Sequence, residues 1–551
     1  MARLFVSLVC LLALSSCVVS ASRPSEPWQT ETEIVTTIAS DPDTIDPQRA
    51  SFANEMSIVG MLYEPLLTWD ASTLTLRPAA ARDLPQVSDD GRTYTYTLRD
   101  GLVYADGGPL EAWRFVDAFA RACDPTVAGE LAFLAYPIVG CEAWNTMDAK
   151  RASPADLAVA RSALGVRAPN AHTVVFALRE PLASFPQVTA MPLASPVRME
   201  GVAAWTDGWR TTKNATLFVG NGPFVFKEWR AGDRLVFERN ERYRQPVRVA
   251  VWTKRVVPDA DTARVLYDAG RIDALAVTPR DLADREVLLS RPDLRRAVGP
   301  CTTYLGFNIA RPPFDDQRVR LAFAKALDKD NYVTSVAKTG RIAFSLVPQG
   351  QPGHAHDDRA QAFDTVEARR LLASSRYGPP LNGLLGAIPV TFSFRPTLAE
   401  REFAMWVADQ LQRNLGVRVV PEVVNSWGHG LVRRIEAQPQ LYRLAWCEDY
   451  PDGRDWYTTL FHSASPFTRT NFHDVRFDDL VTRADRERDP IVREDLYEEA
   501  SRILSREAPG AWLAWTEQWW LVRPELSGYE SSSFDWDFAQ LSLARIVGVK
   551  R

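Results

Sequence analysis

Residues 441–456 read LYRLAWCEDYPDGRDW, the pattern of a strand that ends in an acidic turn. With the strand period of two, one face carries Leu441, Arg443, Ala445, Cys447 and Asp449, and the other carries Tyr442, Leu444, Trp446, Glu448 and Tyr450. The second face is mostly apolar, which predicts that it lies against a core. The first face has a cation at one end and an anion at the other.

This charge pattern suggests a binding edge. An unpaired strand edge offers free N–H and C=O groups to an incoming extended segment, and Arg443 and Asp449 could meet the two termini of a peptide. The segment alone leaves a second interpretation open, an ordinary edge strand followed by a Pro/Asp/Gly turn.

Length and composition indicate a large globular protein. The chain has 551 residues, enough for roughly three or four domains. It is 46% hydrophobic and 24% charged with a net charge of −5, which argues against a polyanion-binding face over the whole chain. We therefore expect no nucleic-acid partner.

The first 17 residues are interpreted as an export signal. Arg3 precedes an apolar run over residues 4–14 that is too short to span a bilayer. The run ends in Leu14-Ser15-Ser16-Cys17, similar to a bacterial lipoprotein box, which predicts acylation of Cys17 and a tether over residues 18–32. The alternative is a secretory signal cleaved after Ala21. We expect an exported protein, at the cell surface or in the periplasm, anchored to the membrane through lipidated Cys17.

Four cysteines remain after Cys10 and Cys17, and an exported protein favours their oxidation. Of the three possible pairings we favour Cys123 with Cys141 and Cys301 with Cys447, which would stabilise the fold by roughly 3 and 4 to 5 kcal/mol. The alternative is buried free thiols.

Elsewhere, strands alternate with helices, which predicts a mixed α/β class. A strand is expected over residues 34–38, a hairpin-rich element over 88–107, and a late strand over 543–549. Helices are expected over 401–415, after Asp489-Pro490, and after Asp315, which is positioned to cap a helix with an apolar face at Val319, Ala322, Phe323, Ala326 and Leu327.

Catalytic motifs are missing from the sequence. It contains no nucleophile elbow, P-loop or zinc-protease spacing. His354 and His356 follow a Pro/Gly-rich run and are interpreted as part of a solvated loop rather than a metal site. We expect no enzyme activity, no metal and no cofactor.

Several stretches in order resemble the extracellular solute-binding proteins of bacterial peptide ABC transporters, the oligopeptide- and dipeptide-binding family. They are TIDP at 44–47, LYEPL at 62–66, residues 88–106, 220–229 with 238–240, 307–328, and DYPD at 449–452. The resemblance implies an α/β fold of two lobes that close on a ligand like a hinged trap. Lobe I would comprise residues 33–75, 200–300 and 517–551, an inserted smaller domain 76–199, and lobe II 301–516.

The resemblance also implies roles for individual residues. Asp449 falls on the position that pairs with the α-amine of a peptide, and Arg443 on one that meets ligand carboxylates. The Cys301–Cys447 pairing looks like a bridge of oligopeptide-binding members. The remaining ligand-facing positions would be Arg434, Trp427 and Trp446, with backbone groups around Ala445, Cys447, Ser51, Phe52 and Ala53. Two departures are Gly453, where a Pro is usual, and Leu131, where a relative has a Tyr.

The function implied is a lipid-anchored, monomeric receptor that captures short peptides of about three to five residues, from the strand rise between Arg443 and Asp449. It would deliver them to the permease subunits of an ABC transporter. The alternatives are the same fold binding an oligosaccharide, a metal chelate or another small solute and, from a different class, an exported hydrolase.

Overall fold

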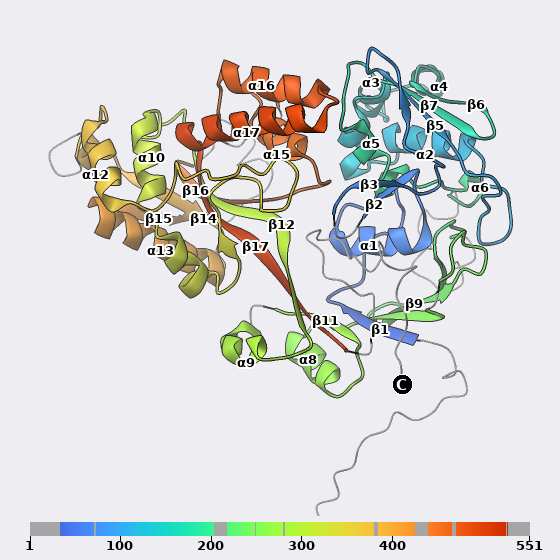
Figure 1. The fold of residues 1–551 in the computed structure, drawn as a ribbon, viewed down its shortest axis with the longest axis horizontal. Coiled ribbons are helices and arrows are strands. Elements are labelled where there is room, and N and C mark those ends of the chain that lie inside the picture. The colour runs from blue at the N-terminus through green and yellow to red at the C-terminus, as the bar shows by residue number, and fades with distance from the viewer. Residues whose placement is uncertain are drawn as a thin grey trace, which may run out of the picture.

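The computed structural model describes residues 33–70, 73–202, 218–247, 249–278, 281–379, 384–424, 439–465, 470–524 and 526. Figure 1 shows two lobes joined by a pair of long strands. The expected signal and tether over residues 1–32, the segment 425–438 that holds Trp427 and Arg434, and the late strand 543–549 lie outside the described residues. Within the described part, no helix combines the length and apolar character needed to cross a membrane.

The two long strands are β12 (Leu294–Phe307) and β17 (Gly510–Val522), paired antiparallel along both their halves. At one end β17 also pairs with β11 (Ala274–Ala276), and at the other β12 pairs with β16 (Leu441–Cys447). Among the described residues, the strands of this sheet follow the order β11-β17-β12-β16-β14-β15, where β14 comprises Val390–Phe394 and β15 comprises Val419–Val423. A further short strand, β13 (Arg341–Ile342), pairs with β17. The β12–β17 ribbon therefore passes from one lobe into the other (Figure 1).

The ribbon is irregular where it passes between the lobes. Its register shifts between Val298 and Thr302, around Gly299. A Cβ on Gly299 would lie 2.3 Å from the Thr516 hydroxyl oxygen, so only glycine lets the strands approach here.

The described part of the other lobe contains three further sheets, of which the smallest is the antiparallel pair β2-β3. The second has the order β1-β10-β9-β8, in which β1 runs parallel to β10, and the third has the order β4-β5-β7-β6 with antiparallel neighbours. One apolar core extends from Ile34 on β1 through Phe176 on β7, so the segments around residues 34, 176 and 237 pack together. The strands are β1 (Glu33–Ile38), β2 (Leu67–Trp69), β3 (Leu76–Pro78), β4 (Gln86–Val87), β5 (Thr93–Thr97), β6 (Val166–Asn170), β7 (Thr173–Ala177), β8 (Phe224–Arg230), β9 (Arg234–Arg239) and β10 (Val251–Val256).

Helices cover these sheets, and many begin at an aspartate whose carboxylate accepts a backbone N–H. Asp489 caps α17 in this way, as the sequence predicts. The helix expected after Asp315 is instead capped by Asp316, whereas Asp315 lies outside it and accepts the Tyr377 hydroxyl. The helices are α1 (Ala53–Leu62), α2 (Trp113–Cys123), α3 (Cys141–Asn145), α4 (Pro154–Ser162), α5 (Phe185–Val188), α6 (Met199–Val202), α8 (Ala260–Asp268), α9 (Arg285–Leu289), α10 (Gln317–Lys325), α11 (Lys329–Asn331), α12 (Thr365–Ser374), α13 (Leu398–Leu415), α15 (Gly453–Phe461), α16 (Val475–Arg486) and α17 (Pro490–Glu507).

Both favoured disulfides are confirmed. Cys123 at the end of α2 is bonded to Cys141 at the start of α3. Cys301 on β12 is bonded to Cys447, its direct partner in the register with β16. The second bridge holds the end of β16, and hence the turn that follows, against the ribbon.

The loop at His354 is less solvated than its sequence suggests. His354 is half-buried, its Nδ1–H donates to the Val347 carbonyl at 2.8 Å, and its ring centroid lies 5.3 Å from that of Trp515. Burial lowers the pKa of His354. The loop therefore packs against β17, although His356 is exposed.

The two lobes also touch along one rim. The Ala183 N–H donates to the Asp485 carbonyl at 2.8 Å, and Arg486 lies 3.4 Å from Glu180. Tyr450, from the acidic turn, is buried in the core that includes Ile34. The turn is therefore fixed by contacts from both lobes.

Glu64 of the LYEPL stretch forms buried hydrogen bonds and an ion pair with distant parts of the chain. Glu64 accepts two N–H groups of Arg244, at 2.6 and 2.8 Å, and the Tyr243 hydroxyl at 2.6 Å. The Asn221 side chain bonds both the N–H and the carbonyl of Glu64. The LYEPL stretch is thereby joined to the chain around residues 221–244.

Replacing Arg244 with Met should lower the free energy of unfolding by about 3 to 5 kcal/mol, because Glu64 would remain buried without its cation. The matched control is Arg239→Met, which breaks a pair to exposed Glu241 and should cost under about 1 kcal/mol. Urea unfolding followed by circular dichroism measures both. Equal losses for the two variants would contradict the role of the Glu64–Arg244 pair.

Candidate functional site

The candidate site is built on β16. It is paired with β12 from Leu441 to Cys447, while on its other side β14 contacts it only at the Phe392–Leu441 pair. In the described part of the chain, the rest of that edge has no neighbouring strand. β16 is therefore internal at its start and open along the remainder.

Side-chain burial along β16 follows the period-two prediction. Ala445 and Cys447 are exposed, while Tyr442, Glu448 and Tyr450 are buried and Leu444 and Trp446 pack against the core around Trp456. Leu441 is fully buried, unlike Ala445 and Cys447 on the same face, because it lies where β14 pairs with β16. The exposed face of this strand accordingly runs from Arg443 to Asp449.

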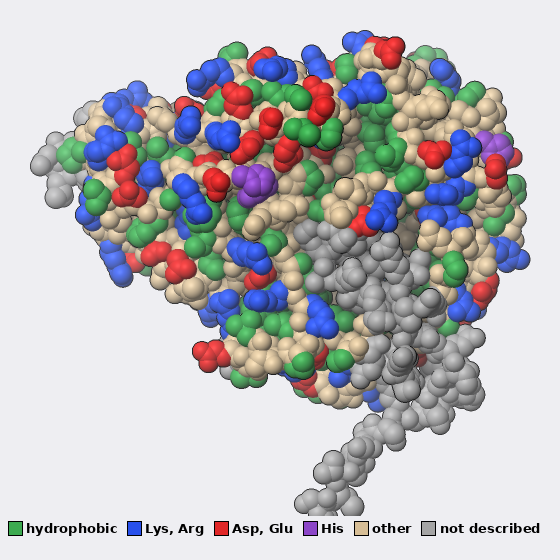
Figure 2. Space-filling model, in the orientation of Figure 1, with side chains coloured by type: hydrophobic (Ala, Val, Ile, Leu, Met, Phe, Trp, Pro, Cys, Tyr) green, Lys and Arg blue, Asp and Glu red, His purple; other side chains and the backbone are tan. Residues whose placement is uncertain are grey.

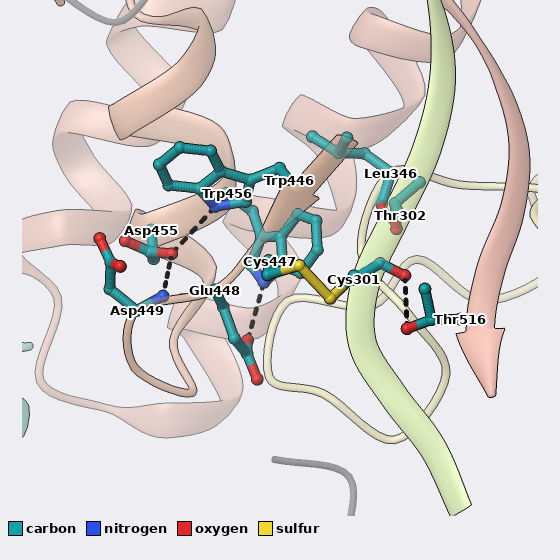
Figure 3. Close-up of a disulfide and its surroundings, with 10 residues drawn as sticks. All are labelled: Cys301, Thr302, Leu346, Trp446, Cys447, Glu448, Asp449, Asp455, Trp456 and Thr516. Atoms are coloured by element: carbon teal, nitrogen blue, oxygen red, sulfur yellow. Dashed lines mark hydrogen bonds between the residues drawn. A yellow bond between two sulfur atoms is a disulfide. The ribbon is translucent and has the colours of Figure 1, made fainter. Parts of the chain in front are cut away.

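Asp449 lies at the end of this face and is half-buried. Its own N–H donates to the Asp455 carboxylate at 2.9 Å, and the Trp446 indole donates to the same oxygen at 3.1 Å (Figure 3). Among the described residues, the Asp449 carboxylate has no ion-pair or hydrogen-bond partner. Burial raises the pKa of Asp449 to about 6.

Two other acidic side chains near the turn, Asp452 and Asp485, are neutralised by arginines. Asp452 accepts two N–H groups of Arg493 at 2.6 and 2.7 Å, and Asp485 is paired with Arg454. Asp449 is thus an acid at the end of an open strand edge for which the described chain supplies no cation. A ligand ammonium would satisfy it.

Gly453, one of the two departures named above, leaves no room for a side chain. It begins α15 directly after its cap Asp452, and a Cβ at this position would lie 2.6 Å from the Tyr497 ring. The Tyr497 ring in turn stacks on Tyr457 with a centroid separation of 5.5 Å. The turn is therefore packed tightly rather than loosened by glycine.

Arg443 marks the other end of the exposed face, and it is not free. Its guanidinium lies 3.3 Å from Glu400, which also pairs with Arg395 at 3.2 Å, and it lies 5.2 Å from the Phe403 ring centroid. Two cations share one carboxylate, so this end keeps one net positive charge. That charge suits a single ligand carboxylate.

The segment 51–53 lies at the start of α1. The N–H groups of Ser51 and Phe52 both donate to Glu55, at 2.9 and 3.2 Å. These two N–H donors are therefore occupied, and the expected role of the segment toward a peptide main chain stays a prediction. The Phe52 side chain is 59% exposed and remains available for contact.

Sequence reasoning missed three partners. Asp455 had a local signal, since it is the last of four acids between residues 448 and 455. Glu400 is 43 residues from Arg443, and Glu55 looked like an ordinary helix residue. Leu131, the second departure, is half-buried and packs against the core that includes Ile34.

Three comparisons show which known proteins the chain is similar to. The family model described as bacterial extracellular solute-binding proteins, family 5 Middle, matches residues 75–467. The periplasmic murein peptide-binding protein MppA of Escherichia coli is 27% identical over 505 residues, 90% of each chain. The probable deoxycholate-binding periplasmic protein YgiS of the same organism is 27% identical over 538 residues, 95% of each chain.

A solved structure of MppA in its unliganded open form superimposes with a TM-score of 0.79 at 25% identity, covering 95% of this chain and 98% of that one. The family resemblance and the two-lobed α/β fold are thereby confirmed.

Replacing Gly453 with Ala should lower the free energy of unfolding by about 1 to 3 kcal/mol, because the new methyl group overlaps the Tyr497 ring. The double variant Gly453→Ala/Tyr497→Leu should lose less than the sum of the single variants, since the smaller side chain leaves room. Urea unfolding measures this coupling. Strict additivity would show that the ring is not the obstacle.

Proposed function

The chain belongs to the bacterial extracellular solute-binding proteins of family 5, and from that premise we propose that it is a receptor for short peptides. It is exported, anchored to the membrane through Cys17, and delivers peptides of about three to five residues to an ABC transporter permease. It acts without chemical turnover and as a monomer. Lobe I, the inserted domain and lobe II follow the boundaries given above, and closure of the lobes buries the ligand.

The observation that carries the proposal is Asp449, a half-buried carboxylate without a cation partner in the described residues, at the end of an open strand edge. The peptide amine binds Asp449 through a charge-assisted bond, and the open edge around Ala445 and Cys447 bonds its main chain. The carboxylate end lies toward Arg443 and Arg395, with Arg434, Trp427 and Trp446 as further contacts. On the opposite lobe the contact is made by the segment Ser51, Phe52 and Ala53, chiefly through the Phe52 ring.

A non-peptide solute is the second candidate, because YgiS is as similar in sequence as MppA. A bile acid is an anion without an amine, so it would leave the Asp449 carboxylate unpaired. The amine site therefore favours peptides.

Asp449→Asn should weaken binding of Ala-Ala-Ala by about 10- to 100-fold, which corresponds to the loss of a charge-assisted bond of about 1.5 to 3 kcal/mol. Isothermal titration calorimetry on ligand-stripped protein measures this, with Asp479→Asn on the exposed face of α16 as the control. N-acetyl-Ala-Ala-Ala should bind wild type poorly. Equal affinity for acetylated and free peptides, or binding of deoxycholate alone, would overturn the amine-site assignment.

Binding should weaken at acid pH. Because the pKa of Asp449 is raised to about 6 in the ligand-free protein, its ionised fraction falls as pH drops through 6, while the peptide amine stays protonated. The affinity for Ala-Ala-Ala should be about tenfold lower at pH 5 than at pH 7. Residual binding by Asp449→Asn should be flat over this range, and a flat wild-type profile would contradict the assignment.

Peptide length should be limited by the strand. Arg443 and Asp449 are six residues apart, about 20 Å along an extended chain. Calorimetry with alanine peptides of two to seven residues should show the highest affinity at three to five. Binding of dipeptides without binding of tripeptides to pentapeptides would exclude this geometry.

A further inference from the structure

The acidic turn holds more carboxyl groups than one peptide amine can pair with. Five acids lie in and around it, and two of them, Asp452 and Asp485, are paired with Arg493 and Arg454. The other three are Glu448, Asp449 and Asp455. Within the described chain, none of these three has an ion pair.

Asp455 is the member of this set nearest to the amine site. It is fully buried, and one carboxylate oxygen accepts the Asp449 N–H and the Trp446 indole N–H. Its other oxygen, Oδ1, is buried and accepts no hydrogen bond from the described residues. Figure 3 shows the Asp449 and Asp455 carboxylates as neighbours on the same side of the turn.

Glu448 repeats this pattern on the other side of the strand. It is 5% exposed, and the Trp456 indole donates to one of its oxygens at 2.8 Å. Its Oε1 is buried and accepts no hydrogen bond within the described part. Burial raises the pKa of Glu448 well above its usual range, and burial together with the negative charge of Asp449 does the same for Asp455.

A metal ion does not fit this set. Among the described residues, no group of three or more His, Cys, Asp and Glu side chains is arranged to hold one. A second organic cation, delivered by the same ligand that occupies Asp449, fits better. At the opposite end of the strand, Arg443 and Arg395 share Glu400, so two cations face one carboxylate there. A second positive charge on the ligand would therefore be favoured only near the ligand's amine end.

We propose that this receptor prefers peptides whose first residue carries a basic side chain, with the α-ammonium on Asp449 and the side-chain cation on Asp455. This inference rests on the proposed peptide-binding function and names its substrate class. A buried carboxylate left without a cation is unfavourable, so a second ligand cation gains affinity that a neutral side chain of the same length does not. Asp455 thereby acts as a specificity-determining residue.

The test compares Lys-Ala-Ala with norleucine-Ala-Ala, which has a similar aliphatic length and no side-chain charge. In calorimetry at pH 7 on ligand-stripped wild type, the lysine peptide should bind about tenfold or more tightly. Ala-Lys-Ala, with the charge moved by one residue, should show no such gain over Ala-norleucine-Ala. Asp455→Asn should reduce the tenfold preference to less than about threefold, while Asp479→Asn should retain it.

The outcomes separate the two claims. If free-amine peptides bind and their acetylated forms do not, but lysine and norleucine peptides bind wild type equally, the basic-residue preference is wrong and the receptor function stands. If no peptide binds, both fail. Should Asp455→Asn not fold by circular dichroism, Nε-acetyl-Lys-Ala-Ala on wild type decides, since it must bind as weakly as the norleucine peptide.

Discussion

An acid without a cation is the constraint on which the binding site depends. Asp449 is held half-buried by the bond from its N–H to Asp455, while arginines neutralise the neighbouring acids at 452 and 485. Removing a charge from water is costly unless it is paired, so the position is maintained only because the surrounding structure fixes it. The Asp449 carboxylate is therefore in an unfavourable environment, which becomes favourable when a cationic ligand pairs with it.

The fold explains how the acid is kept in place. β16 is bonded to β12 along its length and by the Cys301–Cys447 disulfide, and β12 runs with β17 from one lobe to the other. Tyr450 extends from the turn into the core of the opposite lobe, and the Ala183–Asp485 and Glu180–Arg486 contacts also join the two lobes. A change in the arrangement of the two lobes would therefore alter the contacts that hold the acidic turn. Over the face seen in Figure 2, acidic and basic side chains are interspersed, consistent with a site whose charge is local rather than spread over the surface.

The sequence predicted the local features of the site well. Period-two alternation separated exposed Ala445 and Cys447 from buried Tyr442 and Glu448, because a strand with one face on a core must alternate. The favoured pairing of the four cysteines is the one that the structure has. Long-range contacts could not be predicted from the sequence, because Glu400, the partner of Arg443, is on α13. No local pattern reveals that the Ser51 and Phe52 N–H groups donate to Glu55. The cap at Asp316 rather than Asp315 is a one-residue error, since two adjacent aspartates offer the same side chain and only the helix start distinguishes them.

The most direct test of the central claim identifies what the cleft holds when the protein is purified from its own cells. Native mass spectrometry of the intact protein gives the mass of any retained ligand, and tandem mass spectrometry after denaturation gives its structure. We expect peptides of about three to five residues with unblocked amino termini. Retention of a ligand without a free amine, such as a bile acid or an oligosaccharide, and of no peptide, would contradict it.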